Sequence, residues 1–540
     1  MSKKNGKEGL APNSKEAIDP YQQQLEKGMA LEAAGSYRNA AEIYHEIISK
    51  VPLHPQANVR MAALCSKYGT ETDAEPHWQR AIEGDPENHR IRFGYGMCLY
   101  KLQKFAAAVD QYEQVLKILQ ADAIQLPAEE EALICQHLAL ALGRMDRYEE
   151  MEEYLEKAIK LFPGFAHAHD SLGYLRSLTG DSQGAIKHYR LAIEADPKLG
   201  SAHRSLANEK LHTEVDAEIE SMEKLFEAGG VEPAVQMQLA FGLGKAYEDL
   251  GDYEKSFSYL KKGNDIHQDL VPYDVENEIK AISLLKEIYD PEAMADASAF
   301  KNPLVPVFIV GMPRTGSSLL EQIIASHSDA EGIGESVLLP QVCRQGVKDF
   351  PSGLKQYGPI AWRRNGESYL HSAQKIIDGQ HFVVDKLLGN YRFLGVIRMM
   401  LPQAKIIHCV RDPMDVCLSA YKNIFESNAA QFSYDLAGFG KVYRHYELAM
   451  KHWEALMPGW MLKVQYEELI TDPENQVRRI LDYLGLPFEN ECLKYYESRR
   501  AVKTVSMSQV RKPIYKTSIK KWQNYEKQLQ PFKHALSGGE

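Results

Sequence analysis

Apolar and polar positions follow two different periods along this chain of 540 residues. Up to about residue 265, apolar residues recur at helical spacing in segments of 34 residues, three of which begin at Gly35, Gly69 and Gln103. A large aromatic residue stands nine positions after each start, and again in a later segment: Tyr44, Trp78, Tyr112 and Tyr189. A period of this length predicts stacked units of two helices each.

Small residues recur in the same register. Two sets of them are spaced with the aromatic positions: Ala40, Ala74, Ala108 and Ala185, then Ala62, Gly96, Gly173 and Ala207. We expect the small residues where two helices cross closely and the aromatic rings in the gaps between layers. Prolines, which cannot continue a helix, stand between the units. The pattern resembles the tetratricopeptide repeat and covers about residues 20–265, in about seven units.

The period changes near residue 300. Residues 305–310 (VPVFIV) form a short, continuous apolar run, typical of a strand buried in a parallel sheet. Gly311, Arg314, Gly316 and Ser317 follow, and residues 319–327 then read as an amphipathic helix. Strand, glycine loop and helix in this order predict a site where backbone N–H groups bind an anion.

The spacing of Gly311 and Gly316 equals that of the phosphate loop GxxxxGK[ST] of nucleotide triphosphatases. Ser317 stands where those enzymes have the lysine that neutralises the β- and γ-phosphates, which disfavours ATP or GTP hydrolysis. Arg314 instead offers a planar, bidentate cation within the loop, suited to a phosphosulfate.

A second strand and helix carry another arginine. Residues 404–410 (AKIIHCV) read as a sheet strand, and Pro413 opens a helix. Arg411 lies at the end of the strand, and Ser419 lies two turns into the helix. By themselves these two residues favour another interpretation, an arginine held by neighbouring acids and a serine on a helix surface.

Together the two segments resemble sulfotransferases. PRTGSS resembles the loop that binds the 5′-phosphosulfate of the donor 3′-phosphoadenosine 5′-phosphosulfate (PAPS), and RDPMDVCLSAY resembles the segment that binds its 3′-phosphate. The resemblance implies that Arg411 and Ser419 bind the 3′-phosphate. It assigns the rest of the donor site to the loop residues Arg314, Thr315, Gly316, Ser317 and Ser318.

The same resemblance implies the catalytic residues. Glu335 follows Gly334 as the catalytic base does in tyrosylprotein sulfotransferases, and we expect it to accept the acceptor's proton; His327 is the alternative base. Lys386 follows a strand-like run and would neutralise the leaving group. A competing interpretation takes that run as a Walker B strand whose Asp385 holds magnesium.

Three further segments complete the resemblance. Tyr466 resembles the tyrosine that contacts the adenosine, although a core tyrosine at a strand end fits it equally well. Residues 506–522 (SMSQVRKPIYKTSIKKW) resemble the closing segment of the family, in which Ser506 adds a hydrogen bond in the transition state. The candidates there for the 3′-phosphate are Arg511, Lys512 and Lys521.

Charge and cysteine content limit the setting. Residues 1–300 hold 32 Lys and Arg against 50 Asp and Glu, and residues 301–540 hold 31 against 24, so the halves suit different partners. The seven cysteines show no CxxC pair, which favours a reducing compartment. With no signal peptide and no apolar run of about 20 residues, we expect a cytoplasmic protein without transmembrane segments. We find no metal-ligand set and expect no metal.

These observations predict an all-α solenoid followed by an α/β, P-loop-like domain with a central parallel sheet. The expected parts are a disordered leader, the repeats, connecting helices, a sulfotransferase domain and a flexible tail: 1–19, 20–265, 266–302, 303–530 and 531–540. We expect transfer of a sulfuryl group from PAPS to a hydroxyl, with 3′-phosphoadenosine 5′-phosphate (PAP) as product. A protein or peptide bound by the repeats is the expected acceptor, and nucleic acid is not expected. A nucleotide kinase or triphosphatase and a non-catalytic repeat scaffold remain the alternatives.

Overall fold

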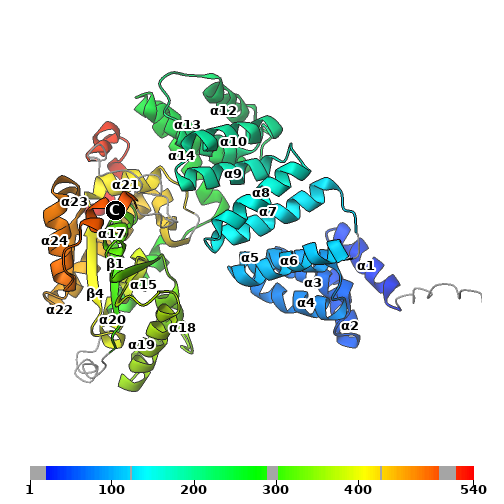
Figure 1. Cartoon of the computed structure of the whole chain (residues 1–540), viewed down its shortest axis with the longest axis horizontal. Helices are drawn as coiled ribbons and strands as arrows, with labels where there is room; N and C mark the ends of the chain where they lie inside the picture. Colours follow the sequence, from blue (N-terminus) through cyan, green and yellow to red (C-terminus); the bar gives the residue numbers. More distant parts are fainter. Residues whose placement is uncertain (1–19, 122–123, 289–301, 426–427, 498–518, 540) are drawn as a thin grey trace, which may run out of the picture. The chain divides into compact units, whose positions relative to one another are not determined.

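A computed structural model of the chain describes residues 20–121, 124–288, 302–425, 428–497 and 519–539 (Figure 1). It divides into two compact units, residues 1–171 and 172–540. The division falls within the repeats, so the later repeats and the sheet belong to one unit. The part boundaries predicted from the sequence stay a prediction.

The first unit is made of helices. Their sequences provide residues that favour helix starts: for example, Pro55 occupies the first turn of α3, and Thr70 and Asp73 form a capping box at α4. The helices are α1 (Gln22–Ala33), α2 (Tyr37–Lys50), α3 (Pro55–Tyr68), α4 (Glu71–Gly84), α5 (His89–Lys101), α6 (Phe105–Ala121), α7 (Ala128–Arg144) and α8 (Tyr148–Leu161), and α9 (Ala166–Thr179) crosses into the second unit.

The predicted pairing of small and aromatic residues is present. A Cβ atom on Gly96 would lie 2.5 Å from the ring of Tyr112, which is fully buried. Gly173 in the second unit stands in the same relation to Tyr189, at 2.7 Å. Glycine is therefore needed where the ring of one helix lies on the backbone of another, which confirms the packing expected from the repeat.

The second unit begins with more repeat helices. They are α10 (Ser182–Ala195), α11 (Gly200–Glu209), α12 (Ala217–Ala228), α13 (Pro233–Asp249) and α14 (Tyr253–Leu270), followed by α15 (Val275–Lys286). The succession α1–α14 confirms the predicted all-α region that precedes the sheet.

A five-stranded parallel sheet follows, as predicted. Its strands are β1 (Val305–Gly311), β2 (Ala330–Gly334), β3 (Phe382–Asp385), β4 (Lys405–Val410) and β5 (Met461–Gln465), in the spatial order β2-β3-β1-β4-β5. The chain runs to one side of β1 for β2 and β3 and to the other side for β4 and β5. Parallel sheets bind ligands at the carboxyl ends of their strands, beside such a reversal.

Helices cover both faces of the sheet, which explains its continuous apolar runs. Val307 and Ile309 of β1 pack on one face, and Phe308 and Val310 pack on the other. The α-helices of this part are α17 (Ser317–Ala325), α18 (Leu338–Arg344), α19 (Pro359–Gln374), α20 (Leu394–Met400), α21 (Pro413–Tyr421), α22 (Leu436–Leu456), α23 (Tyr466–Thr471), α24 (Pro473–Leu484) and α26 (Gln530–Leu536). The 3₁₀-helices are η1 (Ser352–Gln356), η2 (Leu388–Phe393), η3 (Asn428–Tyr434), η4 (Asn490–Glu497) and η5 (Lys521–Tyr525).

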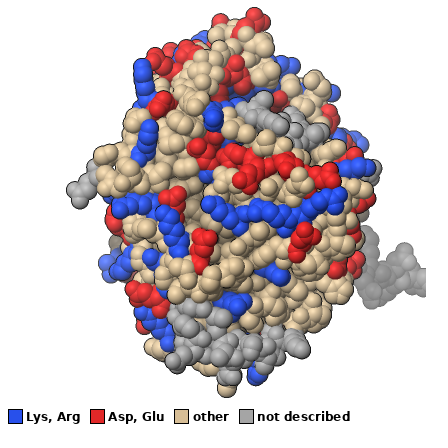
Figure 2. All heavy atoms as spheres, turned by 90° about the vertical axis from the view of Figure 1, so that its left-hand side faces the viewer, with Lys and Arg blue, Asp and Glu red and all other residues tan. Residues whose placement is uncertain are grey.

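Three general features bear on the setting of the protein. Among the described residues, no helix has both the length and the apolar content needed to cross a bilayer. All seven cysteines are described, and all are free thiols. Figure 2 shows Lys and Arg side chains in a band beside a band of Asp and Glu side chains, so neither sign of charge covers this face alone.

Candidate active site

The loop between β1 and α17 is shaped by two glycines with positive φ. A Cβ atom on Gly311 would lie 2.5 Å from the carbonyl oxygen of Cys409, and one on Gly316 would lie 2.3 Å from the ring of Tyr466. The Thr315 hydroxyl donates to the Met312 carbonyl at 2.8 Å and closes the turn. These contacts fit a cradle in which backbone N–H groups face an anion at the start of α17.

The hydroxyls predicted for this loop lie at the start of the helix. Ser317 and Ser318 are the first two residues of α17, and both are buried. Arg314 adopts a positive φ of 69°, which is unusual for a residue with a side chain. Backbone strain of this kind is typical of ligand-binding loops.

The two predicted arginines and Ser419 lie together. The Nε atom of Arg314 donates to the Ser419 hydroxyl at 3.0 Å, and Arg411 donates to the Arg314 carbonyl at 3.0 Å. The Arg411 guanidinium lies 4.8 Å from the centre of the Tyr466 ring. Four residues predicted to bind the donor, from three segments of the chain, therefore form one cluster at the carboxyl edge of the sheet.

Glu335 and Lys386 meet beside this cluster, at the carboxyl ends of β2 and β3. The Lys386 ammonium donates to Oε1 of Glu335 at 2.8 Å. The lysine side chain is 1% exposed, whereas the glutamate side chain is 43% exposed. A buried ammonium beside an accessible carboxylate suits the pairing of an electrostatic stabiliser with a base that meets the acceptor.

A second glutamate, not predicted from the sequence, supports this pair. Glu321 is buried on α17, where its Oε1 atom accepts from the Gly334 backbone N–H at 2.9 Å. Its Oε2 atom lies 4.0 Å from the Lys386 ammonium. The sequence feature that could have identified Glu321 is its place as an acid on the apolar side of the helix LLEQIIA. A buried acid needs a polar partner.

Asp385, the alternative magnesium ligand, is fully buried and holds the turn after β3. It accepts from the Tyr369 hydroxyl at 3.0 Å, the Leu387 N–H at 3.1 Å and the Asn390 amide at 3.2 Å. Burial raises the pKa of its carboxyl to about 7. These contacts explain why an acid is retained in the core.

His327, the alternative base, is bound to the fold through both ring nitrogens. Its Nε2 atom lies 3.0 Å from the Pro487 carbonyl oxygen, and its Nδ1 atom lies 3.0 Å from the Asp329 backbone nitrogen. The side chain is buried. This arrangement favours Glu335 over His327 as the group that meets an acceptor.

The C-terminal candidates divide into two groups. Ser506, Arg511 and Lys512 lie outside the described residues, so their roles stay predictions. Lys521 begins η5, and Asp415 of α21 accepts from the backbone N–H groups on either side of it, those of Lys520 at 2.7 Å and Trp522 at 3.2 Å. Burial raises the pKa of the Asp415 carboxyl, although these two hydrogen bonds oppose that effect. Lys521 is thereby held beside the helix that carries Ser419.

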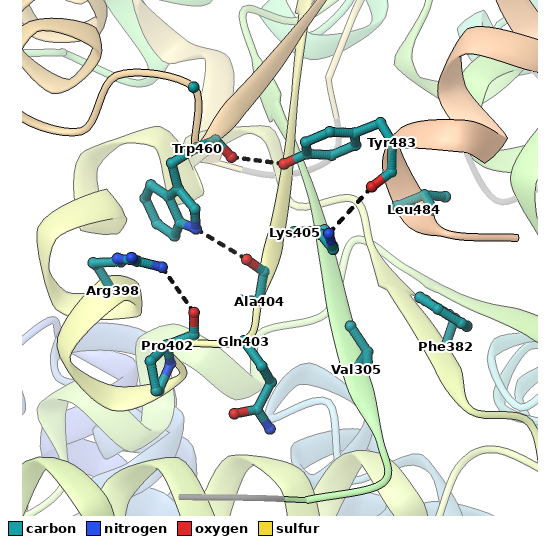
Figure 3. A pocket seen from close by; sticks show the side chains of 11 residues that line it. Val305, Phe382, Arg398, Pro402, Gln403, Ala404, Lys405, Trp460, Tyr483 and Leu484 are labelled. Atoms are coloured by element: carbon teal, nitrogen blue, oxygen red, sulfur yellow. Dashed lines mark hydrogen bonds between the residues drawn. The ribbon is translucent and has the colours of Figure 1, made fainter. Parts of the chain in front are cut away.

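A hollow of about 440 Å³ lies at the opposite edge of the sheet (Figure 3). Its lining includes the first residues of three strands, Val305, Phe382 and Lys405. The Trp460 indole donates to the Ala404 carbonyl at 3.1 Å across it. Because the phosphate loop follows the end of β1, this hollow is separate from the candidate site.

Comparisons with known proteins agree with this arrangement. The profile of the sulfotransferase family matches residues 306–490, and profiles of the tetratricopeptide repeat match residues 72–123, 132–165, 166–199 and 238–268. A protein of Aquifex aeolicus with no assigned function is 26% identical over 557 residues, 97% of this chain and 72% of its own length. Protein-tyrosine sulfotransferase 1 of Danio rerio is 22% identical over 247 residues, 40% of this chain and 65% of its own length.

Among solved structures, a tetratricopeptide repeat protein from Parabacteroides merdae is 16% identical, with a TM-score of 0.36 over 46% of this chain and 93% of its own. The sulfotransferase match covers the sheet and the loop after β1, and the repeat matches cover part of the helical region, between residues 72 and 268. Residues 306–490 of the chain therefore match the sulfotransferase family, and segments within residues 72–268 match the tetratricopeptide repeat.

Proposed function

We propose that this protein transfers a sulfuryl group from PAPS to a hydroxyl of an acceptor. The observation that carries the proposal is the contact of Lys386 with Glu335 at the sheet edge where the loop of Arg314 also lies. The same edge of the sheet thus supplies a base, a buried cation and an anion cradle, the three groups that sulfuryl transfer needs.

In the proposed reaction, Glu335 accepts the proton of the acceptor hydroxyl as its oxygen bonds to sulfur. The bond from sulfur to the bridging phosphate oxygen breaks, and Lys386 neutralises the charge that develops there. The products are a sulfate ester and PAP. Arg314, the N–H groups at the start of α17 and the hydroxyls of Ser317 and Ser318 would hold the 5′-phosphate.

The 3′-phosphate would bind to Arg411 and Ser419, with Tyr466 against the adenosine. The Ser419 hydroxyl accepts from Arg314, so we expect this hydrogen bond to rearrange when the nucleotide binds. Ser506 would add a hydrogen bond in the transition state, and Arg511, Lys512 and Lys521 are the remaining candidates for the 3′-phosphate.

We further infer that the acceptor hydroxyl belongs to a protein or peptide, with tyrosine as the first candidate. Helical repeats form surfaces that bind extended segments, and the similar Danio rerio protein is named as a protein-tyrosine sulfotransferase. A cytoplasmic location is proposed on the seven free thiols, six of which are buried. A small phenol or a sterol is the alternative acceptor, and the test must distinguish it from a protein.

The test begins with nucleotide binding. Purified protein is titrated with PAP, and in parallel with ATP and magnesium, while the thermal unfolding midpoint is followed. A ligand at 100 times its dissociation constant stabilises the folded state by about 2.7 kcal/mol, which is readily detected. We expect a shift with PAP and none with ATP. A shift with ATP alone would instead indicate a kinase or triphosphatase, and no shift with either would indicate a non-catalytic scaffold.

A further inference from the structure

Two repeat helices, α13 and α14, pack on the sulfotransferase domain within the second unit. The Asn264 side chain of α14 donates to the Tyr421 carbonyl at 3.0 Å, and the Ser256 hydroxyl lies 3.0 Å from the Tyr525 hydroxyl of η5. The Phe257 ring stacks on Tyr421, with 5.6 Å between ring centres. The last repeats thus lie directly against the two elements, α21 and η5, that flank the proposed 3′-phosphate site.

One ion pair crosses this interface. The ammonium of Lys422, the C-cap residue that follows α21, lies 2.7 Å from both carboxylate oxygens of Glu248 on α13. The lysine and glutamate side chains are 19% and 13% exposed. An ion pair this well shielded from water is a much stronger electrostatic feature than a surface pair.

Lys422 shares a face of α21 with residues of the candidate site. Asp415, Ser419 and Lys422 follow one another at intervals of four and three residues, which places them on one side of a helix. The first holds the backbone on both sides of Lys521, and the second accepts from Arg314. Glu248 is therefore a repeat residue that reaches the same face as the proposed 3′-phosphate ligand Ser419.

The charges around Lys422 and Glu248 affect one another. Burial, and then the positive charges of Lys521 and Arg314, lower the pKa of the Lys422 ammonium against the opposing effect of Glu248. Burial opposes ionisation of Glu248, but Lys422 and then Lys521 and Lys245 hold the pKa of that carboxyl below its usual range. The positive charges of Arg314 and Lys521 thus act on Lys422, and Glu248 supplies a negative charge beside it.

We propose that Glu248 is a specificity-determining residue of the nucleotide site. Its carboxylate, paired with Lys422, lowers the affinity of the site for nucleotides that carry a 3′-phosphate. This inference rests on the proposed function. A carboxylate within a cation cluster repels an incoming phosphate, and partial burial makes this repulsion larger than in water. Because coupling between sites is reciprocal, a bound nucleotide would also weaken the hold of Glu248 on Lys422. The repeats would in this way set the charge of the donor site.

The test compares affinities for PAP and for adenosine 5′-phosphate, which lacks the 3′-phosphate, by calorimetry on the full chain. Glu248→Gln should bind PAP about tenfold more tightly than the wild type, with a smaller change for adenosine 5′-phosphate. Glu223→Gln is the matched control: Glu223 also pairs with a lysine, Lys255 at 2.7 Å, but within the repeats. We expect its affinity for PAP to equal that of the wild type.

A second comparison covers the case in which Glu248→Gln does not fold, since it leaves Lys422 buried and unpaired. Lys422→Met is compared with the double variant Glu248→Gln/Lys422→Met, in which both charges are gone. The double variant should bind PAP more tightly than Lys422→Met. Equal affinities in this pair, or no gain in a folded Glu248→Gln, would overturn the inference and leave the proposed function intact. Failure of the wild type to bind PAP at all would instead overturn the proposed function, and this inference with it.

Discussion

The ammonium of Lys386 lies 2.8 Å from a carboxylate oxygen of Glu335, although the two residues are 51 positions apart. They follow β2 and β3, which are neighbouring parallel strands, and the Lys386 backbone N–H donates to the Gly334 carbonyl at 2.8 Å. Glu321 holds the turn before Glu335 from the other side. The proposed base and the proposed leaving-group stabiliser are thus positioned by the main chain of adjacent strands, which holds them rigidly.

Replacement of Glu335 by Gln should reduce turnover by about 10²–10⁴-fold and leave the affinity for PAP within a fewfold of the wild type. The amide cannot accept a proton from the acceptor, whereas the loop that would hold the nucleotide is untouched. Single-turnover transfer of labelled sulfate measures the effect. Glu367→Gln, which removes a charge from an exposed ion pair on α19, is the control. Turnover by Glu335→Gln at the level of Glu367→Gln would rule out Glu335 as the base.

Replacement of Gly316 by Ala should abolish nucleotide binding, because the added Cβ atom would lie 2.3 Å from the Tyr466 ring at a φ of 94°. The loop or the tyrosine must move, and both belong to the proposed donor site. Gly379→Ala is the control: Gly379 has a similar positive φ of 84°, but no atom lies within 4 Å of its new Cβ atom. Thermal-shift titration with PAP should separate the two variants. Unchanged binding in Gly316→Ala would mean that the loop takes no part in the site.

Asp385 should make the stability of the protein fall as pH rises toward neutrality. Its carboxyl has a pKa of about 7 in the folded state, above the ordinary value of about 3.9. Folding therefore takes up a proton between these two values, so the free energy of unfolding decreases from about pH 4 to about pH 7 and then levels off.

Asp385→Asn removes this titration, and it should lose less stability than the wild type when the pH is raised across that window. Thermal unfolding at closely spaced pH values gives the comparison. The same slope in both proteins would show that the carboxyl does not titrate near neutrality.

Replacement of Gly96 by Ala should destabilise the first unit by about 1–3 kcal/mol, as is usual when a packed core is overfilled. The added Cβ atom would lie 2.5 Å from the buried Tyr112 ring. Gly164→Ala, whose Cβ would meet its nearest atoms at 4.0 Å, should have little effect. Chemical denaturation followed by circular dichroism gives the difference. Equal midpoints for the two variants would contradict the predicted packing of the repeats.

The sequence by itself determined the elements and much of the candidate site. Small residues such as Gly96 and aromatic residues such as Tyr112 each recur at intervals of 34 residues, and this spacing predicted the helical repeats. A single unit cannot bury its own apolar face, so each unit must pack on the next through the same contacts. The apolar run before Gly311 and the order of the motifs predicted a parallel sheet with an anion loop. Such signals lie in the spacing and order of residues along the chain, so they can be found without knowing which distant segments meet.

Only the tertiary structure decided which distant residues meet. The contact of Glu321 with Gly334 and Lys386 depends on how α17 packs against the sheet, and its sequence signal was a single acid in an apolar helix. Glu248 and Lys422 are 174 positions apart; the first lies on a repeat helix and the second follows α21. No spacing in the sequence predicts this pair. Long-range pairs of this kind are fixed by packing and burial, which depend on the whole fold and not on any one segment.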